Sequence, residues 1–327
     1  MMLKIRVFPR IHVTLIGMNR EGYRINGGIG FSMASPTLNL RFEPTEEISV
    51  IDMRSRGFSK NELTRLDNHL NKVMKDEHFA EGFHCVIEDS QMHSHFGFGT
   101  STMVYLSCVE ALLIINKREY TNDDVVKLSG RGGTSGIGIN TYFNGGFVFD
   151  TGVTNNAVRD LAPSSCFKGG DYRKPLIFKN ISLPGWEMGI CIPPIQNKTE
   201  DEEKVFFDKN CPIEQEAVEN ILYESVYGIS SSLLENDFNT FCKSVDSIQE
   251  TKWKSLERDL YGTDLKVVES LIRKAGAKCV GMSSLGPLLY FFGEDVDSII
   301  DRVNADLTGG KCYKTSFNNS CRILEYD

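Results

Sequence analysis

Residues 93–102 read His93-Ser94-His95-Phe96-Gly97-Phe98-Gly99-Thr100-Ser101-Thr102, and an apolar stretch follows over residues 103–115. The apolar stretch predicts a helix whose first turn is crowded with glycine and hydroxyl residues. N–H groups of a first helical turn have no partner inside the helix, and the helix dipole places partial positive charge beside them. We therefore predict a phosphate-binding loop formed by Gly97, Gly99, Thr100, Ser101 and Thr102. A tight turn into the helix is the alternative interpretation.

This segment differs from two common nucleotide-binding motifs. A Walker loop requires a lysine after its second glycine, and none follows Gly99. The dinucleotide fingerprint G-x-G-x-x-G requires a third glycine at the position of Thr102.

The first half of the chain mixes strand and helix patterns. Alternating apolar residues predict strands near the N-terminus, and Ser59 with Glu62 forms a capping-box pattern ahead of a helix. Thr121 and Asp124 cap a further short helix, after which a glycine-rich segment leads towards a strand. The predicted strands occupy residues 3–8, 38–42, 48–53, 83–87 and 146–149.

The second half starts afresh after a change of composition between residues 163 and 175, where Ser, Gly, Lys and Arg replace the apolar pattern. We place a domain boundary there and predict domains at residues 1–168 and 169–327. A strand is predicted at 186–192, and the charge run at 198–204 predicts a solvated loop, with a partner-binding tail as the alternative. Helices are predicted at 213–226, 231–244 and 264–275, followed by strand, turn, strand and helix up to residue 307. Strands interleaved with helices in both halves predict two α+β domains.

Composition limits the classes of function. The 327 residues carry 36 Lys and Arg against 44 Asp and Glu, a net charge of −8, which disfavours broad nucleic-acid binding. We see neither a signal peptide nor a membrane span, and the nine scattered cysteines contain no C-x-x-C pair. These features predict a cytoplasmic protein with reduced thiols, and they allow a small local basic site for phosphate.

Three further clusters accompany the loop: Pro9-Arg10-Ile11-His12, Gly130-Arg131-Gly132-Gly133-Thr134-Ser135-Gly136-Ile137-Gly138 and the glycine-serine segment 276–287. Their order and spacing resemble the motifs of the GHMP kinase superfamily. The resemblance spans nearly the whole chain. It implies a two-domain α+β fold, with an N-terminal domain that contains a left-handed β-α-β unit, a ferredoxin-like C-terminal domain, and a ligand cleft between them.

One position departs from the kinases of that superfamily. There, Ser-Gly-Ile is followed by an aspartate that acts as base towards the substrate hydroxyl, whereas Gly138 follows Ser135-Gly136-Ile137 here. Because glycine can neither accept a proton nor hold a cation, kinase chemistry with a base at this position is disfavoured.

A narrower family fits better. The chain resembles β-ribofuranosylaminobenzene 5′-phosphate synthases of methanopterin biosynthesis in residues 10–16, 27–30, 130–139, 145–147 and 281–287. The resemblance implies a decarboxylating phosphoribosyl transferase, which joins phosphoribosyl pyrophosphate to 4-hydroxybenzoate or 4-aminobenzoate and releases pyrophosphate and CO2. It also suggests a homodimer. An ATP-dependent small-molecule kinase and a non-catalytic ligand-binding protein are the alternatives.

That chemistry needs cations on the leaving group and donors for the 5-phosphate. The candidate catalytic residues are Arg10, His12, Arg131 and Ser135, and Ser283 and Ser284 join the loop residues as phosphate donors. Arg24 is a further cation within the motif segments. The alternatives are ordinary salt bridges for the arginines and a core position for His12.

The resemblance also implies Mg²⁺, for which the sequence does not define ligands. Asp150, at the end of a predicted strand, is the nearest downstream carboxylate, with a solvated strand end as the alternative. His93 and His95 have i, i+2 spacing but no acidic or third ligand close in sequence, which disfavours a metal site there.

Overall fold

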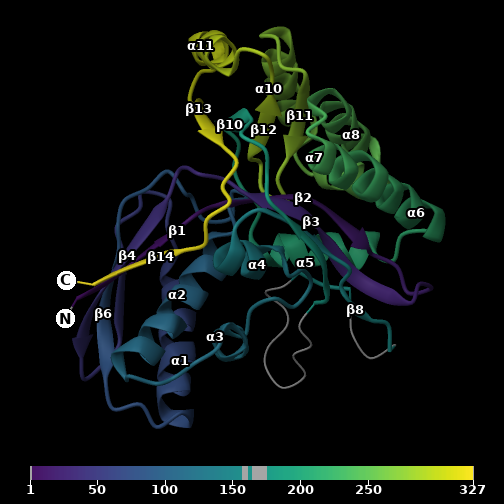
Figure 1. Cartoon of the computed structure of the whole chain (residues 1–327). Helices are drawn as coiled ribbons and strands as arrows, with labels where there is room; N and C mark the ends of the chain where they lie inside the picture. The colour runs from purple at the N-terminus through teal and green to yellow at the C-terminus, as the bar shows by residue number, and fades with distance from the viewer. Residues whose placement is uncertain (1, 157–160, 164–174, 327) are drawn as a thin grey trace.

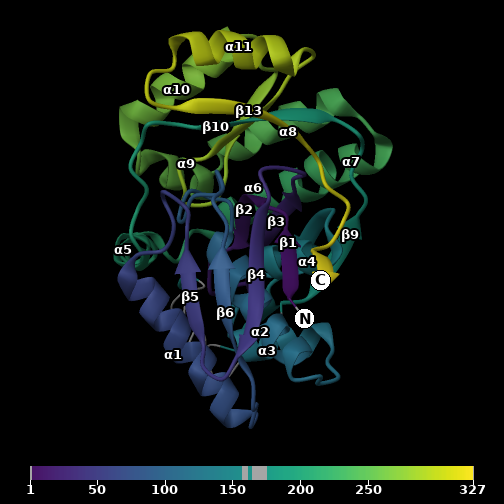
Figure 2. The ribbon, with the colours of Figure 1, turned by 90° about the vertical axis from the view of Figure 1, so that its left-hand side faces the viewer.

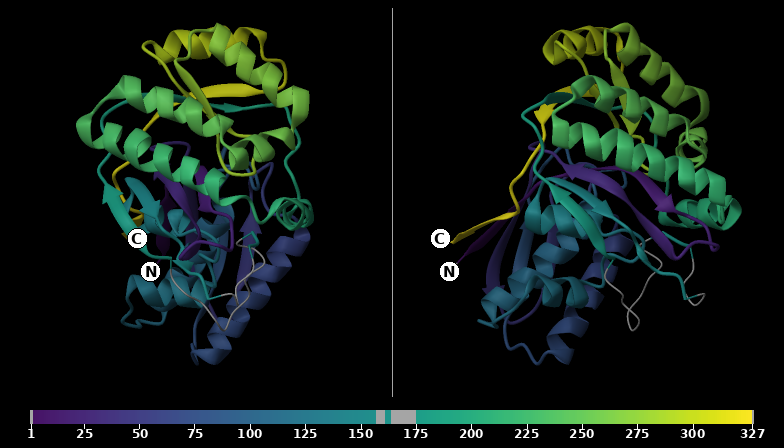
Figure 3. Two further views of the ribbon diagram at one scale, coloured as in Figure 1. Left: turned by 90° about the vertical axis from the view of Figure 1, so that its right-hand side faces the viewer. Right: turned by 45° about the vertical axis from the view of Figure 1, so that its right-hand side comes forward.

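The computed structural model describes residues 2–156, 161–163 and 175–326. Figure 1 shows two stacked halves, with the first strands and α1–α4 in the lower half and the C-terminal helices in the upper half. The two termini lie beside each other, because the last strand pairs with the first (Figure 3). The domain boundary predicted between residues 168 and 169 lies outside the described residues.

The first sheet has the strand order β14-β1-β4-β6-β5. These strands are β14 (Ile323–Tyr326), β1 (Leu3–Val7), β4 (Leu38–Thr45), β6 (Gly82–Ile87) and β5 (Ser49–Asp52). β5 runs parallel to β6, and helix α1 (Lys60–Asp76) connects them in a β-α-β unit, at the edge of the sheet in Figure 2. The predicted capping box of Ser59 and Glu62 starts α1. Leu66, Leu70 and Val73 then face the core, each burial stabilising the fold by about 1.5–3 kcal/mol.

The second sheet carries strands that alternation does not reveal. It has the order β2-β3-β7-β9, with β8 paired to β3. β2 (Arg10–Gly17) and β3 (Arg24–Ser32) are almost continuously buried, because helices cover both faces (Figure 3). Helix α4 (Ile137–Asn144) covers one face. Helices α6 (Gln215–Tyr223), α8 (Phe238–Glu250) and α9 (Lys252–Asp259) contact β2. Strands covered on both faces have no period of two to detect. The other members are β7 (Phe147–Asp150), β8 (Val153–Thr154) and β9 (Ile177–Ile181).

The third sheet confirms the ferredoxin-like expectation. Its order is β11-β12-β10-β13, formed by β10 (Glu187–Ile192), β11 (Cys279–Met282), β12 (Leu289–Phe292) and β13 (Lys311–Ser316). Numbered along the chain, the four strands lie in the order 2-3-1-4 and are antiparallel. Helices precede β11, and α11 (Val296–Asp306) separates β12 from β13, which gives the β-α-β-β-α-β pattern.

Helix α2 (Thr100–Ile115) lies at the centre of the lower half. It is apolar nearly all round and buries eleven side chains, which is typical of a helix enclosed by other elements. The buried carboxylate Glu110 accepts from Arg322 and from the Tyr142 hydroxyl. Helices α3 (Asn122–Ser129) and α4 (Ile137–Asn144) follow, so a helix stands between the glycine-rich segment and β7, where the sequence predicted only a path to the strand.

The prediction of a solvated loop at residues 198–204 is wrong. Thr199 and Glu202 form a capping box that starts helix α5 (Glu200–Asn210). Four acidic residues occupy its first turn, where the helix dipole stabilises negative charge. The charged residues at 198–204 therefore include the start of a helix, where the sequence analysis expected a loop.

Two predicted helices are interrupted. The first divides into α6 (Gln215–Tyr223) and the π-helix η2 (Glu224–Ser230). The second divides into α7 (Ser231–Glu235) and α8 (Phe238–Glu250), because Asn236 adopts a left-handed conformation with φ 56° and Asp237 caps α8. The helices α9 (Lys252–Asp259) and α10 (Gly262–Lys274) complete the upper half. None of the helices in the described ranges is long and apolar enough to cross a membrane.

Candidate functional site

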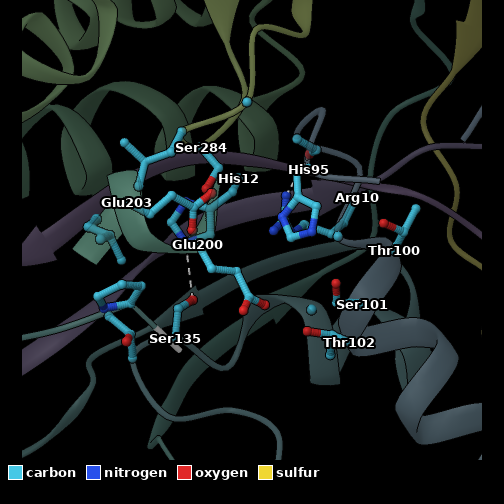
Figure 4. A pocket seen from close by; sticks show the side chains of 18 of the residues that line it. Arg10, His12, His95, Thr100, Ser101, Thr102, Ser135, Glu200, Glu203 and Ser284 are labelled. Atoms are coloured by element: carbon cyan, nitrogen blue, oxygen red, sulfur yellow. Dashed lines mark hydrogen bonds between the residues drawn. The ribbon is translucent and has the colours of Figure 1, made fainter. Parts of the chain in front are cut away.

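A pocket of about 160 Å³ lies where β2, the N-terminus of α2, helix α5 and the β11–β12 loop meet (Figure 4). It gathers ten of the eleven residues that the sequence nominated. Those ten are Arg10, His12, Gly97, Gly99, Thr100, Ser101, Thr102, Arg131, Ser135 and Ser284. The segments come from distant parts of the chain, so only the fold brings them together.

The predicted phosphate loop enters α2 through a left-handed residue. Gly99 is the N-cap with φ 82°, and no side chain caps this end of the helix. The first-turn N–H groups of Thr100, Ser101 and Thr102 therefore face the pocket side of the helix without a side-chain cap. A Cβ added to Gly99 would lie 2.9 Å from Arg10 Nε, so glycine is required both by conformation and by space.

Arg10 lies against this loop. Its Nη1 donates to the Gly97 carbonyl at 2.7 Å, and its backbone N–H donates to Phe98. Its buried Nε has no hydrogen-bond partner among the described residues. Burial lowers the pKa of Arg10 to about 10, which leaves the guanidinium charged at neutral pH.

Arg131 approaches the same helix from the glycine-rich segment. Its guanidinium lies over the Tyr105 ring, 5.2 Å from the centroid, and Nη2 donates weakly to the Thr102 hydroxyl at 3.4 Å. Its Nε is also buried without a partner in the described part of the chain, and burial lowers its pKa. Neither Arg10 nor Arg131 forms an ion pair with a carboxylate within residues 2–156, 161–163 and 175–326. Two part-buried cations, each with a buried and unpaired Nε donor, make a strong anion site.

His12 and Ser135 are linked to a buried carboxylate. His12 Nε2 lies 3.2 Å from Ser135 Oγ, as Figure 4 shows, and the Ser135 hydroxyl donates to Asp150. Burial, together with nearby Arg10 and Lys254, holds the pKa of His12 well below its usual value, so the ring is neutral. Its Nδ1 is buried with no partner among the described residues.

Asp150 is fully buried, and the expectation of a solvated strand end is wrong. Its carboxylate accepts from the N–H groups of Gly136 and Gly152. Burial nevertheless raises its pKa to about 6. Asp150 therefore fixes the glycine-rich segment beneath the pocket.

The two serines of the β11–β12 loop have different places. Ser283 is completely buried behind the pocket, where its hydroxyl accepts from the His12 N–H and donates to the Gly97 carbonyl. Ser284 lines the pocket in a left-handed conformation, and its N–H donates to the His12 carbonyl. The loop packs so closely that a Cβ at Gly286 would collide with the backbone of Phe96.

Helix α5 contributes two carboxylates that the sequence analysis placed in a loop. Glu200 and Glu203 are three residues apart, so they project from one face, and both line the pocket. Burial raises the pKa of Glu203 to about 7. The capping pattern Thr199-x-x-Glu202 is the signal that would have indicated the helix and its orientation.

Three residues beside the loop offer metal ligands. Glu62, His95 and Glu200 have ligand atoms within 4.8 Å of one another. Burial by itself would raise the pKa of Glu62, but hydrogen bonds from His95 and Ser59 lower it to about 2. The acidic partners of His95 come from α1 and α5, far away in sequence, so the argument against a metal at His95 does not hold in the fold.

Two remaining candidates are also placed. Arg24 donates to the carbonyls of Thr151 and Gly152 and does not line the pocket. Gly138 lines it opposite Thr102, whose Cγ2 would lie 3.3 Å from an added Cβ. A longer side chain at this position would point at the start of α2.

Comparison with solved structures shows the fold. Mevalonate kinase of L. major matches with a TM-score of 0.68 and 13% identity over 97% of this chain and 96% of its own. A putative sugar kinase from Campylobacter jejuni matches with a TM-score of 0.72 and 13% identity over 99% and 98%. This chain has the fold of the GHMP kinase superfamily. At such identities the two structures show the fold alone.

Comparison with curated proteins adds a narrower relationship, whereas no family model matches the chain. Two relatives are named β-ribofuranosylphenol 5′-phosphate synthase. The protein of Methanothermobacter thermautotrophicus is 28% identical over 92% of this chain and 91% of its own length. That of Methanocaldococcus jannaschii is 29% identical over 90% of each. This GHMP-fold chain is thus similar to these enzymes over nearly its full length.

Proposed function

We propose that this protein is a decarboxylating phosphoribosyl transferase that joins phosphoribosyl pyrophosphate to 4-hydroxybenzoate or 4-aminobenzoate, in the pathway to tetrahydromethanopterin. The observation that carries the proposal is the pair Arg10 and Arg131, two part-buried arginines beside the uncapped start of α2, each with a buried, unpaired Nε and without a carboxylate partner in the described residues. A substrate with phosphate groups at both ends of a ribose supplies several anionic oxygens to such a site. The names of the curated relatives favour a phenol product, and hence 4-hydroxybenzoate.

The same pocket gives less support to phosphoryl transfer from ATP. Gly138 places no carboxylate opposite the start of α2, and Asp150 already accepts three hydrogen bonds in the core. The reaction proposed here needs no base at Gly138. It needs stabilisation of a leaving pyrophosphate, which Arg10, Arg131 and the α2 N-terminus provide.

Mg²⁺ fits a group of side chains at the edge of the pocket. The carboxylates of Glu62 and Glu200 supply the oxygen ligands that this ion prefers, with His95 as a nitrogen neighbour. When bound, the ion would neutralise charge on pyrophosphate as it leaves. The arginines orient the phosphates, and the pocket wall of His12 and Ser135 borders the space left for the acceptor.

The test supplies purified protein with Mg²⁺, phosphoribosyl pyrophosphate and carboxyl-labelled 4-hydroxybenzoate or 4-aminobenzoate. We expect CO2 and pyrophosphate in equal amounts, because attack by the ring carbon that bears the carboxylate makes the riboside and loss of the carboxylate restores aromaticity. Chelation of Mg²⁺ should suppress both products.

Other outcomes identify the alternatives. Turnover of ATP on a small alcohol, with none of phosphoribosyl pyrophosphate, would show a kinase. Binding of phosphoribosyl pyrophosphate without turnover with either acid would show a ligand-binding protein.

A further inference from the structure

Glu203 lines the pocket, and its carboxylate has no partner among the residues that the structure describes. Its side chain forms neither a hydrogen bond nor an ion pair with another residue that the structure describes. Glu200 from the same helix pairs with Arg65, and Glu257 accepts from Trp253 and Lys254. Glu203 is therefore the pocket acid that is available to a ligand.

Its surroundings are apolar on one side. Leu15, Phe207 and Leu285 line the pocket, and each is less than a tenth exposed. Phe207 stands one turn after Glu203 on α5, so the ring and the carboxylate share a helix face. A flat aromatic acid fits such a wall, while under the proposed function the phosphates bind at Arg10, Arg131 and the start of α2.

We infer that Glu203 is the general base for the 4-hydroxyl group of the aromatic acceptor, and that this side chain makes the enzyme prefer 4-hydroxybenzoate to 4-aminobenzoate. The inference rests on the proposed function. It adds an acceptor subsite, formed by Glu203, Leu15, Phe207 and Leu285, and a catalytic role for a residue in it.

The proton and electrons balance as follows. The Glu203 carboxylate takes the phenolic proton, and the electron pair of that O–H bond moves through the ring to the carbon that carries the carboxylate. That carbon forms a bond to C1 of the ribose as the bond from C1 to pyrophosphate breaks. The C–CO2 bond then breaks, its electron pair restores the aromatic ring, and the phenolate oxygen recovers the proton from Glu203. An amine pushes electrons from a free lone pair without losing a proton first, so 4-aminobenzoate does not need this base.

The titratable and charged groups around Glu203 come from several elements. Arg10 and His12 lie on β2, His95 on the loop before α2, and Glu200 on α5. Arg131 lies on the glycine-rich segment, Tyr261 just before α10, and Glu257 with Lys254 on α9. Arg10 and His95 favour the carboxylate, while Glu200 and Glu257 oppose it. With burial, the balance places the pKa of Glu203 at about 7, where a base acts efficiently at neutral pH.

The decisive variant is Glu203→Gln, with Asp201→Asn as the matched control on the exposed side of the same helix turn. For Glu203→Gln we expect kcat/KM with 4-hydroxybenzoate to fall by about 100-fold or more, and with 4-aminobenzoate by less than about tenfold. Asp201→Asn should change neither. Glu203→Asp should restore part of the activity on 4-hydroxybenzoate.

A measurement on the unaltered protein tests the role of Glu203 even if the variant does not fold. Its kcat/KM for 4-hydroxybenzoate, relative to that for 4-aminobenzoate, should decrease as the pH falls through about 7, because Glu203 becomes protonated. A ratio independent of pH, wild-type activity of Glu203→Gln on 4-hydroxybenzoate, or equal losses on both acids would overturn the role of Glu203 and leave the proposed function standing. Failure of the unaltered protein to use either acid would overturn both.

Discussion

Arg10 and Arg131 are positively charged residues that line the pocket, and neither has a carboxylate partner among the described residues. In each, the buried Nε has no hydrogen-bond partner in the described part of the chain. Leaving such donors unpaired costs free energy in the unliganded protein. The open donors are therefore best explained by an anionic ligand that supplies the missing acceptors.

The two arginines can be tested one at a time. A charge-assisted hydrogen bond contributes about 1.5–3 kcal/mol. Arg131→Met and Arg10→Met should therefore each weaken the binding of phosphoribosyl pyrophosphate by about 10- to 100-fold. Calorimetric titration measures this directly. Arg41→Met, at a surface pair with Glu88, serves as control and should bind like the parent. Unchanged affinity in both pocket variants would mean that the phosphates bind elsewhere.

Gly99 tests the loop itself. Gly99→Ala and Gly262→Ala both place a side chain at positive φ, which costs about 1–2 kcal/mol of stability. Only the Cβ at Gly99 meets Arg10, whereas the space around Gly262 is open. We expect similar losses in melting temperature but weaker phosphate binding for Gly99→Ala alone. Equal phosphate affinities of the two variants would show that this loop is only a turn into the helix and does not bind phosphate.

At the scale of single elements, helix α5 connects local sequence to the site. Its capping box orients Glu200 and Glu203 towards the pocket. Helix α3 has an equivalent capping box at Thr121 and Asp124 but contributes no residue to the pocket. The two helices form a matched pair.

Thr199→Ala and Thr121→Ala should each cost about 1 kcal/mol of unfolding free energy, because each removes an N-cap acceptor. Only Thr199→Ala should also raise the KM for the aromatic acid, since fraying of α5 displaces Glu203. Urea unfolding and steady-state kinetics provide the two measurements. A raised KM in both variants would point to a global effect instead.

At the scale of the whole molecule, the end of the chain is held against its centre. Arg322, just before β14, donates to the buried carboxylate of Glu110 on α2. Its guanidinium also lies over the rings of Tyr142 and Phe143. β14 then pairs with β1. The helix that the predicted phosphate-binding loop enters is thus linked to the C-terminal strand.

Glu110→Gln should lower the free energy of unfolding by about 3–5 kcal/mol, because it leaves the Arg322 charge without its partner in a buried place. The double variant Glu110→Gln with Arg322→Met should be more stable than the sum of the single losses predicts. Chemical unfolding of the four proteins measures this coupling. Strict additivity would show that the pair does not act as a unit.

The sequence by itself determined the local elements and the superfamily fold. Capping boxes at Ser59 and Thr121 started helices where expected, and the apolar stretch after Gly99 formed α2. These signals are local: a cap and a periodic face lie within one or two turns of chain. The ferredoxin-like sheet was expected from the resemblance of the motifs to the GHMP kinase superfamily, and the strand order confirms it.

Only the tertiary structure decided which of these pieces form one pocket. In the fold, Ser283 lies behind the pocket and Asp150 is buried. Glu200, which the sequence placed in a loop, lies beside Glu62 and His95. Separations of more than a hundred residues along the chain leave no periodic trace, because such contacts depend on how β2, α2 and α5 pack. Glu203 was invisible as a candidate for the same reason: in sequence it belongs to a charged run, and burial against the pocket wall is what raises its pKa and directs it to a ligand.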